Sequence, residues 1–165
     1  MNRSIKTICG VVVVALATAA ASALAQTPIT GKAYCVSVGM SPMEPIGDRA
    51  GHALQVATYS CRSEGGPMDG GVMTGSNIYE WDGGKAVLLS ATGVGRKPGS
   101  ILSFLATEGT TTLIMTEGKV TGFTGLGKGI VKFASGSAAV LNGKTYSYTA
   151  RPISPVQFVI ETTYD

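Results

Sequence analysis

The chain has 165 residues, with 13 Lys and Arg against 10 Asp and Glu and a single His. The length suits one domain with a buried core, and the small positive charge forms no basic stripe, which excludes nucleic acid as an expected partner. Glycine occurs 23 times, about twice its usual frequency, and separates short apolar stretches along the chain.

The first residues follow the three-part pattern of a secretory signal peptide. Arg3 and Lys6 are basic, an uncharged Val- and Ala-rich run extends to Leu24, and small residues precede a cleavage site between Ala25 and Gln26. A transmembrane anchor is the alternative, but it would need about 20 apolar residues and no such cleavage site. We predict that residues 1–25 are removed on export to the periplasm or the medium, leaving one domain, residues 26–165.

Two cysteines remain after this cleavage, Cys35 and Cys61. Exported proteins mature in an oxidising compartment, where a pair of cysteines usually forms a disulfide bond. A metal site or a redox pair is the alternative, but a separation of 26 residues fits neither C-x-x-C nor a zinc knuckle. We predict a structural Cys35–Cys61 disulfide, which the chain-entropy model values at roughly 3.5 kcal/mol.

Short apolar or alternating stretches then recur at intervals of about ten residues, a pattern typical of an all-β sandwich or barrel. No long stretch has helical periodicity, although the loop from Gly39 to Gly51 has room for a turn of helix, which Pro42 and Pro45 would limit. The predicted strands are residues 32–38, 52–61, 71–81, 85–94, 100–107, 111–117, 129–135, 144–152 and 156–164.

Glycine-containing turns connect several of these strands. Asp82-Gly83-Gly84, Glu108-Gly109 and Asn142-Gly143 are predicted hairpin turns, because glycine adopts positive φ at little cost. Eight or nine strands in one domain would leave exposed edges, and closure into a barrel removes them. We therefore predict a single antiparallel eight-stranded β-barrel.

The stretch GFTGLGKG nearly matches the phosphate-binding pattern G-x-x-x-x-G-K-[ST]. Gly122, Gly127 and Lys128 occupy the required positions, but Gly129 replaces the hydroxyl that would bind Mg²⁺. The following residues, IVKFASG, predict a strand, whereas a phosphate-binding loop precedes a helix. We therefore expect no nucleotide binding.

The wider segment, residues 117–136, has the sequence EGKVTGFTGLGKGIVKFASG and resembles the hairpin signature of the allene oxide cyclase-like barrel superfamily. That signature consists of a strand, a tight Gly turn and the next strand. Its match is carried by Gly118-Lys119-Val120, Gly122-Phe123, Gly125 and Gly127, while Thr116 replaces the first Gly. The superfamily includes plant allene oxide cyclases, dirigent proteins and small uncharacterised bacterial domains. The resemblance implies a calycin-like, eight-stranded barrel with an apolar interior, often in a homo-oligomer, and no catalytic residue can be aligned.

His52 is the only histidine, and no G-x-S-x-G elbow accompanies it, so we expect it to make an ordinary hydrogen bond at the start of a strand. The alternative is a copper site. Met40 and Met43 offer soft thioether ligands near His52, and Met68 and Met73 could add to them.

Glu80 stands between Tyr79 and Trp81. Because neighbours in a strand face opposite ways, and the bulky rings are expected in the core, Glu80 should meet solvent. An inward-facing Glu80 would instead have a raised pKa and suit acid–base chemistry.

An aromatic stripe is the best candidate for a binding site. Tyr146 and Tyr148 alternate onto one face of their strand, and Phe158 lies on the adjacent strand. These rings either fill the core or line a pocket for an apolar ligand, and Arg151 stands where it could pair with a ligand carboxylate.

The leading hypothesis is an exported, non-catalytic barrel that binds a small apolar molecule or a protein partner. A barrel-type isomerase or cyclase would need a carboxylate such as Glu80, Glu117 or Glu161, or a tyrosine, beside the cavity. A copper-binding protein would need Met40, Met43 and His52 to converge. No metal or nucleotide cofactor, and no membrane span after the leader, is predicted.

Overall fold

The computed structural model describes residues 27–165, so the predicted signal peptide and its cleavage site between Ala25 and Gln26 lie outside the described residues. Nine strands and one short 3₁₀ helix make up the described chain. In chain order they are β1 (Ile29–Met40), β2 (Glu44–Pro45), β3 (His52–Glu64), β4 (Val72–Asp82), β5 (Lys85–Lys97), β6 (Ser100–Thr116), β7 (Lys119–Ala134), η1 (Gly136–Leu141), β8 (Thr145–Pro152) and β9 (Gln157–Tyr164).

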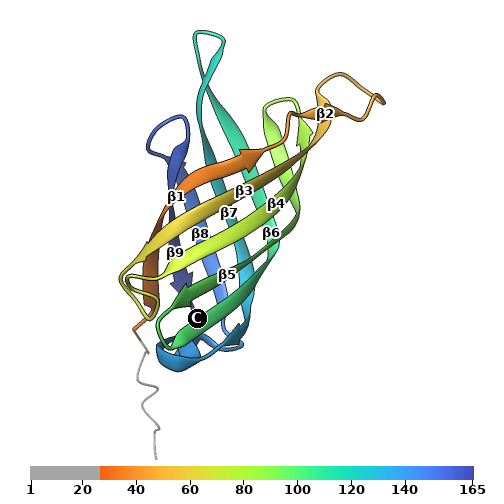
Figure 1. Ribbon diagram of the computed structural model, residues 1–165. Coiled ribbons are helices and arrows are strands. Elements are labelled where there is room, and N and C mark those ends of the chain that lie inside the picture. The colour runs from red at the N-terminus through yellow and green to blue at the C-terminus, as the bar shows by residue number, and fades with distance from the viewer. Residues whose placement is uncertain (1–26) are drawn as a thin grey trace, which may run out of the picture.

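The eight longer strands form a closed antiparallel barrel (Figure 1). From β3 to β9 each strand pairs with the next along the chain, and β1 pairs with both β3 and β9. This double pairing of β1 leaves no free edge in the ring. The predicted all-β, single antiparallel eight-stranded barrel is therefore confirmed, and β2 is an extra strand that pairs with the start of β3.

The two ends of the barrel differ. At one end lie η1, the β3–β4 and β5–β6 connections and the C-terminus, and at the other lie β2 and the β4–β5, β6–β7 and β8–β9 connections (Figure 1). Ala138 and Leu141 of η1 are almost fully buried and pack with Met68, Leu102 and Val131. We call the end closed by this cluster the floor and the opposite end the mouth.

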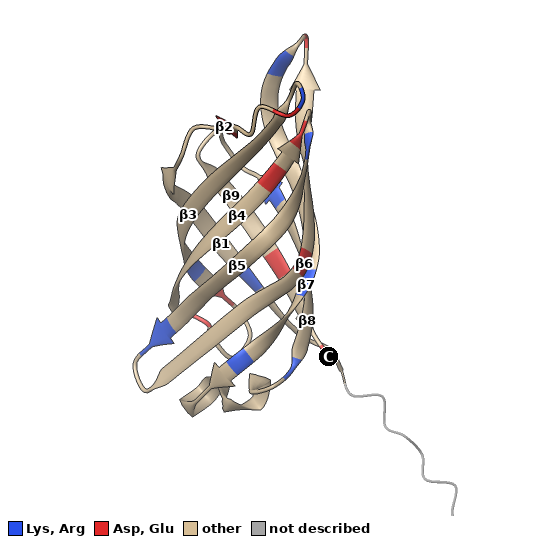
Figure 2. Cartoon of the chain, turned by 90° about the vertical axis from the view of Figure 1, so that its right-hand side faces the viewer, with Lys and Arg blue, Asp and Glu red and all other residues tan. Residues whose placement is uncertain are grey.

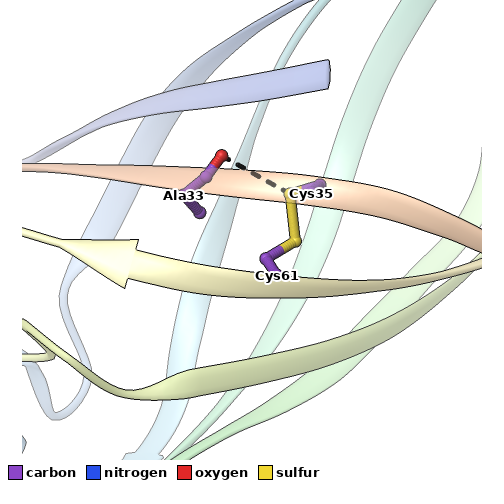
Figure 3. Close-up of a disulfide and its surroundings, with 3 residues drawn as sticks. All are labelled: Ala33, Cys35 and Cys61. Carbon is purple, nitrogen blue, oxygen red and sulfur yellow. Dashed lines mark hydrogen bonds between the residues drawn. A yellow bond between two sulfur atoms is a disulfide. The ribbon is translucent and has the colours of Figure 1, made fainter. Parts of the chain in front are cut away.

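The predicted Cys35–Cys61 disulfide is present and joins β1 to β3 (Figure 3). The two residues are direct partners in the β1–β3 register and are 2% and 3% exposed. Residues 41–51 between these strands form the longest connection in the described barrel. The disulfide therefore holds together β1 and β3, the two neighbouring strands that are joined by the longest and least constraining loop.

The predicted hairpin turn at Glu108-Gly109 is wrong, because residues 100–116 form one continuous strand, β6. A bulge between Ala106 and Glu108 lets β6 continue its pairing with β7 on both sides of this point. Gly109 serves close packing and not a turn, since a Cβ there would lie 2.6 Å from the Tyr148 hydroxyl. The turn comes later, at Glu117 and Gly118, whose φ angles are 50° and 76°.

The stretch GFTGLGKG lies within β7, which begins at Lys119 and so extends ten residues before the predicted start at Gly129. Its four glycines pair with β6, and Gly125, Gly127 and Gly129 also pair with β8. The strand that was predicted after this stretch is thus the same strand that contains it.

Two further turn predictions have different outcomes. Asp82-Gly83-Gly84 is the β4–β5 turn as predicted, with Gly83 at a φ of 61°. Asn142-Gly143 is not a strand-to-strand hairpin, because η1 intervenes between β7 and β8. The described loop from Gly39 to Gly51 contains β2 and no turn of helix, in keeping with the limit that its prolines set.

Candidate functional site

The barrel surrounds a cavity of about 670 Å³ that extends from the floor to the mouth. This volume lies within the range of sites that hold small organic molecules. Leu102 and Val131 line it near the floor, and Met43, Val120 and Pro155 line it near the mouth. Within the described part of the chain, no Asp, Glu, Lys, Arg or His lines the cavity.

The predicted aromatic stripe does line this cavity. Tyr146, Tyr148 and Phe158 all face it, as alternation along β8 and β9 predicts. Arg151 does not, because it is the neighbour of the inward-facing Ala150 and lies on the outer face, where its Nη2 is 3.7 Å from Glu161 Oε1. The structure therefore separates Arg151 from the three rings.

Glycines on neighbouring strands explain why aromatic rings leave the barrel hollow. Gly129 is the direct partner of Tyr146, and Gly127 is the direct partner of Tyr148. A Cβ at Gly129 would lie 2.3 Å from the Tyr146 hydroxyl oxygen, so the ring occupies the space of the missing side chain. The same arrangement places Tyr59 over Gly75, with 2.4 Å between the hydroxyl and such a Cβ. Because these rings lie over the glycines of the adjacent strand, they leave the centre of the barrel open.

Five of the six tyrosines of the chain line the cavity and come from four strands: Tyr59 of β3, Tyr79 of β4, Tyr146 and Tyr148 of β8, and Tyr164 of β9. We call their hydroxyls the tyrosine belt. Burial raises the pKa of Tyr148 to about 12 and those of the other four above their usual value. At neutral pH the belt is therefore uncharged.

Three other polar side chains face the cavity from β3 and β4. Trp81 Nε1 donates to Gln55 Oε1 at 3.1 Å, and Gln55 Nε2 donates to the Ser41 carbonyl oxygen at 3.2 Å. Asn77 Nδ2 donates to the Tyr79 hydroxyl at 2.8 Å, while its buried Oδ1 has no hydrogen-bond partner among the described residues. An unpaired buried carbonyl costs roughly 1–3 kcal/mol, so this oxygen is a locally unfavourable feature of the wall.

Phenylalanine rings replace tyrosines toward the mouth. The ring of Phe158 makes edge-to-face contacts with Phe123, at a centroid distance of 5.7 Å, and with Tyr59, at 5.8 Å. Met40, the last residue of β1, and Val120, near the start of β7, also line the cavity toward the mouth. The cavity lining thus combines apolar side chains with the tyrosine hydroxyls, and with further polar side chains such as Thr121, Ser154 and Gln157 toward the mouth.

His52 belongs to a separate cluster on the outer face, at the start of β3. Its Nδ1 bonds to Asp48, and its Nε2 lies 2.8 Å from Glu80 Oε1. Arg49 bridges Asp48 and Asp82 with contacts of 2.8 and 3.0 Å. The bonds to Asp48 and then Glu80 raise the pKa of His52, while the bond to His52 lowers the pKa of Asp48. This network ties the 41–51 loop to the rim of β3 and β4.

The structure does not bring together the copper ligands considered from sequence. Met40 and Met43 line the cavity, but His52 does not, and both of its ring nitrogens face carboxylates. Within residues 27–165, no group of three His, Cys, Asp or Glu side chains has a geometry that could hold a metal ion.

The three carboxylates considered for catalysis lie away from the cavity. Glu80 bonds to His52 on the outer face, as expected from the inward Tyr79 and Trp81. Glu161 pairs with Lys32 at 3.0 Å, and Glu117 occupies the β6–β7 turn. The charged residues are distributed along the strands and turns and are not gathered in one stripe (Figure 2).

Sequence reasoning missed Tyr59, Gln55 and Asn77 as cavity residues. Alternation along β3 places Gln55 and Tyr59 on the same face as Cys61, so the predicted disulfide was a signal that could have found them. Asn77 could have been found in the same way, because it lies two residues before Tyr79 and shares the inward face of β4 with Tyr79 and Trp81.

No protein-family model, curated protein or solved structure matches this chain. Among the described residues, no helix is long and apolar enough to cross a membrane.

Proposed function

We propose that this protein binds an uncharged, largely apolar small molecule inside its barrel. The observation that carries the proposal is a cavity of about 670 Å³ whose described lining contains aromatic, aliphatic and hydroxyl side chains but no charged one. Burial of apolar ligand surface supplies the main driving force in such a site, at about 25 cal/mol per Å².

Binding is preferred to catalysis because of where the acidic side chains lie. An isomerase or cyclase like those of the allene oxide cyclase-like superfamily would need an acid or base beside its substrate, and Glu80, Glu117 and Glu161 all lie elsewhere. The tyrosines that do line the cavity have raised pKa values and are poor bases at neutral pH. The resemblance to that superfamily thus supports the barrel architecture and an apolar interior, and by itself supplies no chemistry.

The test uses Trp81, which is the only tryptophan and lines the cavity. Titration with the neutral probe N-phenyl-1-naphthylamine at pH 7 should change Trp81 emission saturably, with a stoichiometry of one. Ala150→Phe places a ring in the cavity and should weaken binding, whereas Thr149→Phe, its outward-facing neighbour, is the matched control. A linear, non-saturating response, or equal loss in both variants, would count against the proposal.

We further propose that the protein is exported and works in an oxidising compartment. The buried Cys35–Cys61 disulfide and the leader-like first 25 residues support this location. Intact-mass analysis of the protein purified from its own cells should give a chain that begins at Gln26 and is two hydrogens lighter than its reduced form. A full-length, reduced chain would contradict it.

A further inference from the structure

The tyrosine belt contains hydrogen-bonding groups that the protein itself does not use. No hydrogen bond made by residues 27–165 involves the hydroxyls of Tyr59, Tyr146, Tyr148 or Tyr164, whereas the Tyr79 hydroxyl is paired with Asn77 and Thr111. All five side chains line the cavity. Asn77 Oδ1 is the one fully buried polar side-chain atom of residues 27–165 without a partner, so the four hydroxyl oxygens are not enclosed by the wall and are open to whatever fills the cavity.

These hydroxyls lie close to one another. Tyr146 of β8 and Tyr164 of β9 are direct partners in the register. The rings of Tyr146 and Tyr148 have a centroid distance of 6.3 Å, and those of Tyr146 and Tyr164 a distance of 6.0 Å. Residues far apart in sequence therefore present their hydroxyls to one region of the cavity.

Apolar side chains line the cavity next to the tyrosines. Leu102, Phe104 and Val131 pack with Tyr146, while Phe123 and Phe158 lie toward the mouth. A ligand that fills the cavity thus meets both apolar surface and the tyrosine hydroxyls.

We propose that the tyrosine belt is a polar subsite that selects uncharged ligands carrying a hydroxyl or carbonyl group over both plain hydrocarbons and anions. This inference rests on the proposed ligand-binding function. A neutral tyrosine hydroxyl donates a hydrogen bond to such an oxygen and also accepts one from a ligand hydroxyl. A hydrocarbon would leave the hydroxyls unpaired, and a polar site discriminates strongly against a ligand that lacks its polar group.

Anions are disfavoured for a separate reason. A carboxylate in the cavity would lose its hydration, and the described lining offers no Lys, Arg or His to compensate for that loss. Arg151, which sequence analysis considered for this role, lies on the outer face beside Glu161. The alcohol and the acid of one chain length should therefore bind with different affinities.

The experiment measures displacement of N-phenyl-1-naphthylamine by 1-decanol and by decanoate at pH 8, where the acid is ionised. It compares the unmodified protein with Tyr59→Phe/Tyr148→Phe. Each substitution removes one hydroxyl and keeps the ring, and Tyr34→Phe, on an exposed residue of β1, is the matched control. Circular dichroism and thermal unfolding establish that each variant is folded.

Decanol should compete at least tenfold more tightly than decanoate in the unmodified protein. In the double variant, decanol affinity measured relative to that variant's own probe affinity should fall about tenfold, since each neutral hydrogen bond contributes a factor of several. The Tyr34→Phe protein should behave like the unmodified one.

The outcomes separate this inference from the proposed function. If the probe binds but decanoate competes as well as decanol, or if the double variant keeps full decanol affinity, the polar subsite is wrong while the binding function stands. If neither the probe nor 1-decanol raises the melting temperature of the unmodified protein, both proposals fail.

Discussion

At the scale of single residues, glycine and tyrosine act as a pair in this barrel. A ring that faces inward normally fills the core, but here Tyr59, Tyr146 and Tyr148 lie against glycines of the adjacent strand. The missing Cβ atoms let the rings lie along the wall, so their bulk does not occupy the centre. The cavity is therefore a consequence of where glycines stand on neighbouring strands.

The first prediction concerns Gly129. In Gly129→Ala the new Cβ would lie 2.4 Å from the Leu105 backbone oxygen and 2.3 Å from the Tyr146 hydroxyl. Because a backbone atom cannot move aside cheaply, we expect a loss of about 1–3 kcal/mol in unfolding free energy, measured by urea denaturation. Gly84→Ala is the control, since a Cβ there meets nothing within 4 Å. A comparable loss in both variants would show that the close contact at Gly129 is not the cause.

The second prediction concerns pH and His52. Its two carboxylate partners, Asp48 and Glu80, raise its folded-state pKa above its usual value near 6.5, with Arg49 opposing them. The stability that this charged ring contributes is therefore fully present below about pH 6.5 and is lost as pH rises through the folded-state pKa.

The melting temperature of the unmodified protein should consequently fall, relative to that of His52→Gln, as pH is raised from about 6 toward 9. His52→Gln keeps a polar side chain at this position but does not titrate. A difference between the two proteins that stays constant with pH would contradict the assignment of the charged ring.

At the scale of elements, the connection between β1 and β3 is the weak point of the barrel. Most neighbouring strands are joined by tight turns, such as Gly83-Gly84 or Glu117-Gly118, whereas β1 and β3 are joined by residues 41–51. Two features compensate for this length. The disulfide joins the middles of the strands, and the Asp48–His52–Glu80 network anchors the loop to the rim.

The third prediction is that Cys35→Ala/Cys61→Ala lowers the unfolding free energy by about 3.5 kcal/mol, the chain-entropy value for a closed loop of this length. Urea denaturation of the variant and of the unmodified oxidised protein measures the difference. The reduced unmodified protein is the matched control, because it keeps both sulfur atoms and lacks only the bond. A loss below about 1 kcal/mol in both would mean that the strand pairing alone holds β1 to β3.

At the scale of the whole molecule, the barrel is closed at one end and hollow in the middle. η1 and its apolar cluster close the floor, and the eight-stranded ring has no exposed edge. A protein that leaves about 670 Å³ of its interior unfilled loses the packing contacts that those wall atoms would otherwise make. A molecule that restores these contacts binds the folded state only, and so stabilises the whole fold.

The fourth prediction follows from this linkage. At a free probe concentration of 100 times Kd, the folded protein should gain about 2.7 kcal/mol and unfold at a higher temperature. Differential scanning calorimetry with and without N-phenyl-1-naphthylamine measures the shift. Ala150→Phe, whose added ring occupies part of the cavity, should show a smaller shift than Thr149→Phe. An unchanged melting temperature at saturating probe would exclude binding to the folded barrel.

Much of the fold could be predicted from the sequence, because local patterns determine it. Alternation along each strand identified the inward faces of β8 and β9, and the same argument placed Tyr79 and Trp81 inside and Glu80 outside. The pairing of Cys35 with Cys61 followed from their number, since only two cysteines lie outside the predicted leader.

Only the tertiary structure decided what the glycines do and which side chains meet. Sequence cannot tell a glycine that turns the chain, such as Gly118, from one that makes room for a ring, such as Gly109, because the difference depends on the strand opposite. For the same reason His52 meets Glu80, 28 residues away, and the tyrosines of β3, β4, β8 and β9 converge. Local periodicity determines which way a residue faces, whereas the register and closure of the barrel determine what it faces.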